Sequence, residues 1–84
     1  FAFQLDDDAC SQGGIKAGDF VAVDPEAPVK PGAYVCVRYK LSFTVRRFRE
    51  SSDTCFISEH EDYASLSESD CELIGPVIQV VRTY

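Results

Sequence analysis

Apolar and polar residues alternate with a period of two along most of this chain, and that alternation limits the elements it can form. The alternating runs are rich in Val, Ile, Phe and Tyr and cover residues 1–5, 20–23, 33–39, 42–49, 54–58 and 73–84. Such alternation is typical of β-strands, whose successive side chains point to opposite faces of a sheet. A sustained apolar stripe of helical spacing is absent, so any helix is a turn or two, in residues 8–12 or 63–67. The sequence predicts an all-β fold.

Turn-forming residues separate these runs. Asp24-Pro25 and Lys30-Pro31-Gly32 bracket one connection, and residues 50–53 form a polar turn. Lys40-Leu41 falls at the tip of a predicted hairpin. The chain has no internal repeat, interdomain linker or low-complexity segment, so residues 1–84 are predicted to be one domain.

The chain is small and acidic. With 8 basic and 14 acidic residues among 84, its formal net charge is −6. Nucleic-acid affinity rests on clustered Lys and Arg, so we do not expect this domain to contact DNA itself. A chain this short buries only about 60% of its unfolded surface, and a partner subunit is one way to add to a marginal core.

The four cysteines are Cys10, Cys36, Cys55 and Cys71. An even number would suit a disulfide framework in a secreted protein, but we expect reduced thiols and a cytoplasmic location. There is no C-x-x-C pair and His60 is the one histidine, so neither a metal site nor a cofactor is predicted. No signal peptide or membrane span is recognisable. The chain begins without Met inside an alternating run, which we interpret as a fragment of a longer protein.

The stretch DDDACSQGGIKAGD, residues 6–19, reads like a loop that presents a nucleophile. With the apolar strand that follows it, this stretch resembles the LexA-like serine peptidases, in which a Ser-Met pair precedes a Gly-Asp and an apolar strand. These are the C-terminal domains of LexA, of UmuD-type SOS mutagenesis proteins and of phage repressors. The spacing from Ala9 to Gly18-Asp19 fits the family's spacing from its serine.

The resemblance continues to the end of the chain. Residues 30–37 look like a family strand entered through a glycine, residues 43–48 (FTVRRF) look like its F-T-V-K-K-L strand, and residues 73–78 are similar to its closing strand. The block at residues 57–63 fits poorly, because Glu59 and Glu61 replace a Pro and an Asn. The ordered blocks imply the family's fold, a LexA/signal-peptidase-like arrangement of small, highly twisted sheets.

The resemblance also implies a serine–lysine dyad, in which the serine attacks a peptide bond of the same polypeptide and a neutral lysine takes its proton. Carried over position by position, the serine falls on Ala9 and the lysine on Arg46. A methyl group cannot attack a carbonyl, and a guanidinium stays protonated in proteins, so we expect no peptidase activity. The alternative is a self-cleaving LexA/UmuD-type peptidase whose nucleophile was mutated to Ala.

Cys10 and Ser11 are the neighbours that could replace the nucleophile. A shift of one or two residues is expected to turn either side chain away from a strand-mounted base. A misplacement of about 1 Å can remove roughly two orders of magnitude of rate, so we expect no catalysis from them.

Arg46 shares a strand face with Thr44 and Phe48, so a buried guanidinium there needs a partner. We hypothesise an ion pair with Asp7 or Asp8; the alternative is that Arg46 points to water and residues 6–8 form a solvated acidic turn. His60, between two glutamates, could be pH-sensitive, but a surface loop is the favoured interpretation.

If catalysis is absent, association is the remaining role. In the last run Val77 and Val81 share one face with Gln79, while Ile78, Val80 and Tyr84 share the other with Arg82. In a strand with one solvent-exposed face, apolar and polar residues would alternate more strictly. We therefore expect Ile78, Val80 and Tyr84 to meet a second subunit; the alternative is a strand buried on both sides within the monomer.

The resemblance points the same way, since these C-terminal domains dimerise and, in phage repressors, build higher assemblies that give cooperative operator binding. We predict the oligomerisation domain of a phage-type transcriptional repressor that has lost self-cleavage, with DNA binding in an N-terminal helix-turn-helix domain absent from this fragment. Without RecA-stimulated cleavage, an antirepressor protein or another ligand would release it. A UmuD-like polymerase accessory subunit is a third interpretation.

Overall fold

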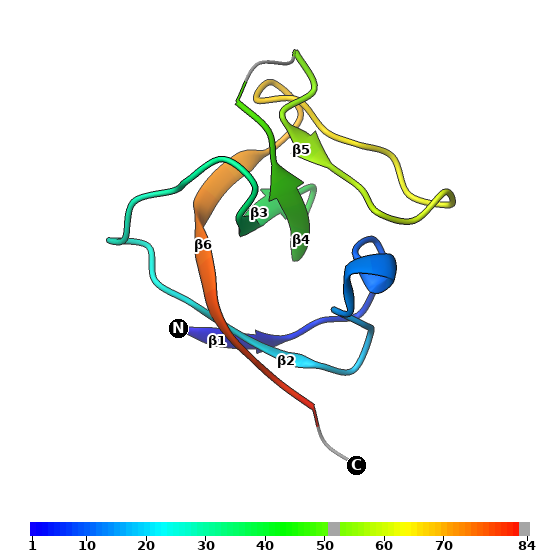
Figure 1. The fold of residues 1–84 in the computed structure, drawn as a ribbon, viewed down its shortest axis with the longest axis vertical. Helices are drawn as coiled ribbons and strands as arrows, with labels where there is room; N and C mark the ends of the chain where they lie inside the picture. Colours follow the sequence, from blue (N-terminus) through cyan, green and yellow to red (C-terminus); the bar gives the residue numbers. More distant parts are fainter. Residues whose placement is uncertain (51–52, 83–84) are drawn as a thin grey trace.

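The strands form one antiparallel sheet. The structure, a computed structural model, describes residues 1–50 and 53–82. Its elements are β1 (Ala2–Gln4), a 3-10 helix η1 (Ser11–Gly13), β2 (Phe20–Val23), β3 (Tyr34–Tyr39), β4 (Ser42–Phe48), β5 (Phe56–Ile57) and β6 (Glu72–Val81). The six strands lie in the order β1-β2-β6-β3-β4-β5, and every neighbouring pair is antiparallel (Figure 1). The all-β prediction is confirmed.

The last strand, β6, joins the two halves of the sheet. Its first half pairs with β3, from Glu72 to Pro76, and its second half pairs with β2, from Val77 to Val81. In Figure 1 it is the long curved ribbon between the β3–β4 part and the β1–β2 part. At the crossing, a Cβ on Gly75 would lie 2.7 Å from the Asp24 carbonyl oxygen, so a larger residue does not fit there.

Both faces of β3 are buried, which places a separate apolar cluster on each side of it. Val35 and Val37 belong to one cluster, whose other buried members are Cys55, Phe56 and Leu66. Cys36 belongs to the second cluster, whose other buried members are Leu5, Cys10, Ile15, Val21, Val23 and Val45. A strand enclosed on both sides reads as a continuous apolar run, and Val35-Cys36-Val37 is such a run.

The strand predictions hold with local differences. The run predicted at residues 54–58 is shorter, and Arg49 donates its N–H to the Cys55 carbonyl immediately before β5 (2.7 Å). Residues 63–67 are not helical, because Leu66 is buried and exchanges two backbone hydrogen bonds with Phe56. A short helix does form near residues 8–12, as the 3-10 helix η1. The predicted turn at residues 50–53 lies partly outside the described residues, and residues 83–84 of the last predicted run lie wholly outside them.

The β3–β4 hairpin turns at Lys40-Leu41, as predicted, with Tyr39 opposite Ser42. Lys40 adopts a left-handed backbone conformation (φ 58°), the one non-glycine residue among those described to do so. Leu41 is 95% exposed. The hairpin therefore ends in an apolar side chain that nothing in the described residues covers.

The four cysteines are free thiols, three of them buried and Cys71 half-buried. Within residues 1–50 and 53–82, no helix has the length and hydrophobicity needed to cross a membrane.

Candidate functional site: a loop packed on a buried arginine

The loop between β1 and β2 carries the position of the family's serine. Its base is closed by hydrogen bonds from the Leu5 N–H to the Asp19 carbonyl (2.8 Å) and from the Gly18 N–H to the Leu5 carbonyl (2.7 Å). The buried Asp19 carboxylate accepts from the Lys16 N–H (2.9 Å) and from Nε and Nη2 of Arg82, each at 3.0 Å. These donors, Arg82 foremost, lower the pKa of Asp19. The loop is thus tied to the residue that follows β6.

Ala9 lies inside the protein and is fully buried. Its N–H donates to the Asp7 carboxylate (3.1 Å). Its carbonyl accepts from the Glu59 N–H (2.6 Å), and the Ser58 hydroxyl lies 3.1 Å from the same oxygen. The segment after β5 is therefore bonded directly to the backbone at the position where the family has its nucleophile.

Arg46, at the position of the family's lysine, is also buried, with 4% of its surface exposed. Nη1 donates to the Thr44 hydroxyl (2.8 Å) and to its neighbour's carbonyl, that of Val45 (2.9 Å), and Nε donates to the Ala64 carbonyl (3.3 Å). The guanidinium is satisfied by neutral oxygen atoms of β4 and of the segment after β5.

The predicted ion pair of Arg46 with Asp7 or Asp8 is wrong. No carboxylate of the described residues lies within 4.0 Å of the guanidinium. Thr44 stands between the charges instead: its hydroxyl accepts from Arg46 and donates to Asp7 (2.6 Å). Asp8 bonds the loop itself, accepting the Ala17 N–H (2.9 Å). The structure thus brings the loop of Ala9 and the strand of Arg46 together through a bridging hydroxyl. The sequence showed Thr44 on the correct face but gave no sign of this role.

Cys10 and Ser11 differ in their surroundings. Cys10 is fully buried in the apolar cluster, and its thiol donates to the Val45 carbonyl with the sulfur 3.4 Å from the oxygen. Burial raises the pKa of Cys10 to about 12, so the thiol stays protonated near neutral pH. Ser11 is half-buried and begins η1, with its N–H donating to the Asp8 carbonyl (3.0 Å).

Glu59 is a residue of this region that the sequence reasoning did not assign. Its carboxylate accepts from the Tyr34 hydroxyl and pairs with Nη1 of Arg47 (3.1 Å). The Cα of Gly13 lies against the same Tyr34–Glu59 contact, where a Cβ would collide with both side chains. Desolvation and the Glu59 contact raise the pKa of Tyr34 to about 12. The available signal was the misfit at this position, since Glu59 replaces the family's proline.

His60 follows in the same segment and is half-buried rather than fully exposed. Its Nδ1 accepts the Asp62 N–H (3.1 Å), and its ring stacks edge-on against Tyr63, with the ring centroids 5.4 Å apart. Among the described residues, no group of three or more His, Cys, Asp or Glu side chains is placed to hold a metal ion.

The interface residues predicted on the last strand are exposed where the structure describes them. Ile78 is 63% exposed and Val80 is 38% exposed, while Tyr84 lies outside the described residues. Val81, predicted on the opposite face, is exposed as well, and Phe20 pairs with it across β2 and β6. A strand buried on both sides within the monomer is therefore excluded for residues 78–81.

Comparisons with known proteins agree with this fold. A protein-family model described as Peptidase S24-like matches residues 1–78. The LexA repressors of two Corynebacterium glutamicum strains, ATCC 13032 and R, are each 26% identical to this chain over 83 residues, which is 98% of its length. The match covers 36% and 33% of those repressors, so the chain spans about a third of their length.

Proposed function

Because this chain belongs to the Peptidase S24-like family, we propose that it is the oligomerisation domain of a phage-type transcriptional repressor without self-cleavage. The relatives it matches are LexA repressors, and it corresponds to about a third of each. On this proposal a separate domain binds DNA. Two or more copies of this domain hold the DNA-binding domains together, so that operator half-sites are bound at high effective concentration.

The observation that carries the proposal is the exposed apolar end of β6. Ile78 and Val80 share one face of the strand and are 63% and 38% exposed. On the other face Val81 is 48% exposed, beside its β2 partner Phe20, which is 43% exposed. Exposed large apolar residues close together are typical of protein interaction sites, and we assign that role to the face of Ile78 and Val80. A second copy of the same surface satisfies it through a two-fold contact, the commonest symmetry of soluble oligomers.

The absence of self-cleavage is proposed from the side chains at the dyad positions. Ala9 offers no nucleophile, and the Arg46 guanidinium is held by donated hydrogen bonds rather than placed as a base. Burial of Ala9 under the Ser58–Glu59 segment supports the same conclusion, because a scissile peptide has to reach the nucleophile.

The association is tested by sedimentation equilibrium of the 84-residue chain and two matched variants. We expect a reversible dimer that Ile78→Asp converts to a monomer. Leu73→Asp places the same charge on an exposed apolar residue at the other end of β6 and is expected to keep the dimer. A wild-type chain that stays monomeric up to about 1 mM, where even a weak contact is populated, refutes the proposal.

The loss of cleavage is tested in the longer parent protein. We expect no self-cleavage at mildly alkaline pH from Ala9→Ser alone, because Arg46 cannot take the serine proton. The double variant Ala9→Ser/Arg46→Lys restores both groups of the dyad. Its self-cleavage measures whether the site can still bind a peptide. Cleavage by the single variant would support the alternative, a LexA/UmuD-type peptidase whose serine was replaced.

A further inference from the structure

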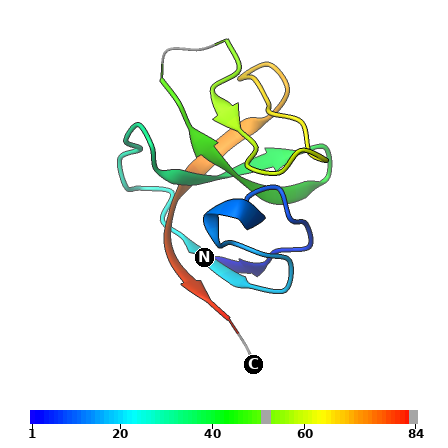
Figure 2. The same cartoon turned by 45° about the vertical axis from the view of Figure 1, so that its right-hand side comes forward.

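One segment contacts both positions that the resemblance assigns to the dyad. It consists of residues 58–64, directly after β5, and is called the covering segment below. Near its start the Glu59 N–H donates to the Ala9 carbonyl (2.6 Å). At its end the Ala64 carbonyl accepts from Nε of Arg46 (3.3 Å). Figure 2 shows the segment passing beside η1 after it leaves β5. Both dyad positions are buried, so the covering segment forms part of what encloses them.

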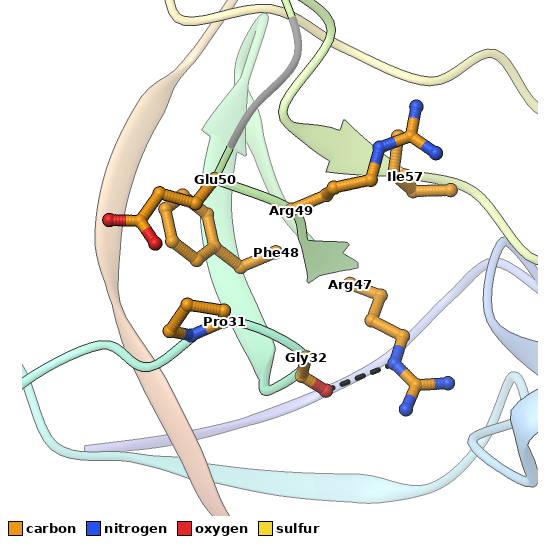
Figure 3. Close-up of a pocket in the computed structure, with 7 residues that line it drawn as sticks. All are labelled: Pro31, Gly32, Arg47, Phe48, Arg49, Glu50 and Ile57. Atoms are coloured by element: carbon orange, nitrogen blue, oxygen red, sulfur yellow. Dashed lines mark hydrogen bonds between the residues drawn. The ribbon is translucent and has the colours of Figure 1, made fainter.

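The Glu59 side chain fastens the covering segment to the sheet. Its carboxylate accepts from the Tyr34 hydroxyl of β3 and pairs with Nη1 of Arg47 of β4 (3.1 Å). Arg47 is itself fixed, because its Nε donates to the Gly32 carbonyl (3.0 Å), the dashed contact in Figure 3. Its guanidinium also lies over the Tyr34 ring, 5.4 Å from the centroid. The contact of Glu59 with Tyr34 and Arg47 is called the latch below.

The two halves of the latch differ in strength. The Arg47 side chain is 48% exposed, and ion pairs at such exposed positions contribute little to stability. The Glu59 side chain is 22% exposed, and its bond from the Tyr34 hydroxyl is a hydrogen bond to an ionised carboxylate. Such charge-assisted hydrogen bonds are stronger than neutral ones. The Tyr34 hydroxyl is therefore the main fastening of the covering segment.

Between its ends the covering segment bonds to itself. The N–H groups of Asp62 and Tyr63 donate to Nδ1 and to the carbonyl of His60, each at 3.1 Å. Glu61 between them is exposed. Segments with few contacts to the core open locally at a lower free energy than the whole domain unfolds. The covering segment can thus lift from Ala9 while the sheet stays intact, provided that the latch is released.

We propose that the latch holds the covering segment closed over the dyad positions, and that this closure is a third barrier to self-cleavage beside Ala9 and Arg46. The inference rests on the proposed function, because it assumes that self-cleavage is absent. A scissile peptide reaches position 9 only when the segment is open, and weakening the latch raises the open fraction. Glu59, Tyr34 and Arg47 are positioning residues, since their side chains act through the covering segment.

Opening is measured by the rate at which iodoacetamide modifies Cys10 in the 84-residue chain, read by mass spectrometry of timed samples. Cys10 follows Ala9 and is fully buried, so it reacts only when its surroundings open. Tyr34→Phe removes one hydroxyl without a change of charge. We expect it to speed the reaction of Cys10 by about tenfold, because a hydrogen bond to a charged group is lost. Cys36, buried in the same apolar cluster, is expected to keep its rate.

Two variants separate opening from other effects. Tyr39→Phe makes the same substitution in β3 outside the latch and is expected to leave the Cys10 rate unchanged. Arg47→Leu removes a cation within electrostatic reach of Cys10, which by itself would raise the pKa of the thiol and slow its reaction. We expect a reaction about two- to fivefold faster instead, since half of the latch is lost. An unchanged Cys10 rate in Tyr34→Phe, or equal acceleration of Cys10 and Cys36, overturns the proposal.

The barrier itself is tested in the longer parent protein. Adding Tyr34→Phe to Ala9→Ser/Arg46→Lys is expected to speed self-cleavage at mildly alkaline pH by about tenfold, in step with the open fraction. Equal rates with and without Tyr34→Phe, including an equal lack of cleavage, overturn the barrier. Cleavage by Ala9→Ser alone would refute the proposed absence of self-cleavage and leave the Cys10 result in force, so the two failures are distinguishable.

Discussion

Replacing Thr44 with Val should destabilise the domain by about 3 kcal/mol, because it removes the hydroxyl between Arg46 and Asp7. Thr44 is 3% exposed and Arg46 is 4% exposed, and the bridging hydroxyl makes bonds of 2.8 and 2.6 Å to the two charged groups. Hydrogen bonds to charged groups contribute about 1.5–3 kcal/mol each. Two such bonds together contribute about 3–6 kcal/mol. Half-buried Asp7 can bind water once the hydroxyl is lost, so we expect a loss at the lower end, about 3 kcal/mol.

Thr44→Ser is the control, since it keeps the hydroxyl and loses one buried methyl group, at a cost of about 1 kcal/mol. Urea unfolding followed by circular dichroism at neutral pH measures both free energies of unfolding. A valine variant as stable as the serine variant would refute the reasoning, because it would show that the hydroxyl bridge contributes nothing. Against a total stability of roughly 5–15 kcal/mol for small domains, the expected difference of about 2 kcal/mol is readily measured.

Three further predictions follow from other contacts. Asp19, whose pKa is lowered from 3.8 mainly by Arg82, should stabilise the fold at neutral pH and lose this contribution as the pH falls below about 4 through the lowered pKa; the stability difference between wild type and Asp19→Asn, measured by urea unfolding at pH 7 and pH 3, should shrink at the lower pH. Gly75→Ala should cost about 1–3 kcal/mol, because the new Cβ would lie 2.7 and 2.9 Å from backbone atoms of Asp24 and Pro25, and an unchanged midpoint of thermal unfolding would contradict this. Iodoacetamide at pH 8 should modify half-buried Cys71 at least tenfold faster than buried Cys10, Cys36 and Cys55, as read by mass spectrometry of timed samples.

The strands were predictable because alternation and turn chemistry are local signals. Phe20–Val23 and the Lys40-Leu41 turn fall where the sequence places them. Contacts between segments distant in the sequence were harder to predict. Thr44 and Asp7 are 37 residues apart, and no pattern in the sequence indicates that a neutral hydroxyl, rather than a carboxylate, would meet Arg46. Leu66 illustrates the same limit, because its pairing with Phe56 overrides the local tendency that suggested a helical turn.

Glu59 shows how a misfit can be informative. The block around it departed from the family pattern, and its backbone N–H and carboxylate turn out to bind the Ala9 carbonyl and the Tyr34–Arg47 pair. The departure was visible in the sequence, but its partners were not, because they come from the loop before β2, from β3 and from β4.

The position of β6 in the sheet has a consequence for how the chain folds during synthesis. Both halves of the sheet are incomplete without it, since β2 pairs with its second half and β3 with its first. Residues 72–81 leave the ribosome after the other described strands, so β2, already paired with β1, must wait for its second partner more than fifty residues downstream. Loops of that length close slowly and leave unpaired strand edges exposed meanwhile, so the nascent chain passes through an aggregation-prone interval that ends when β6 emerges.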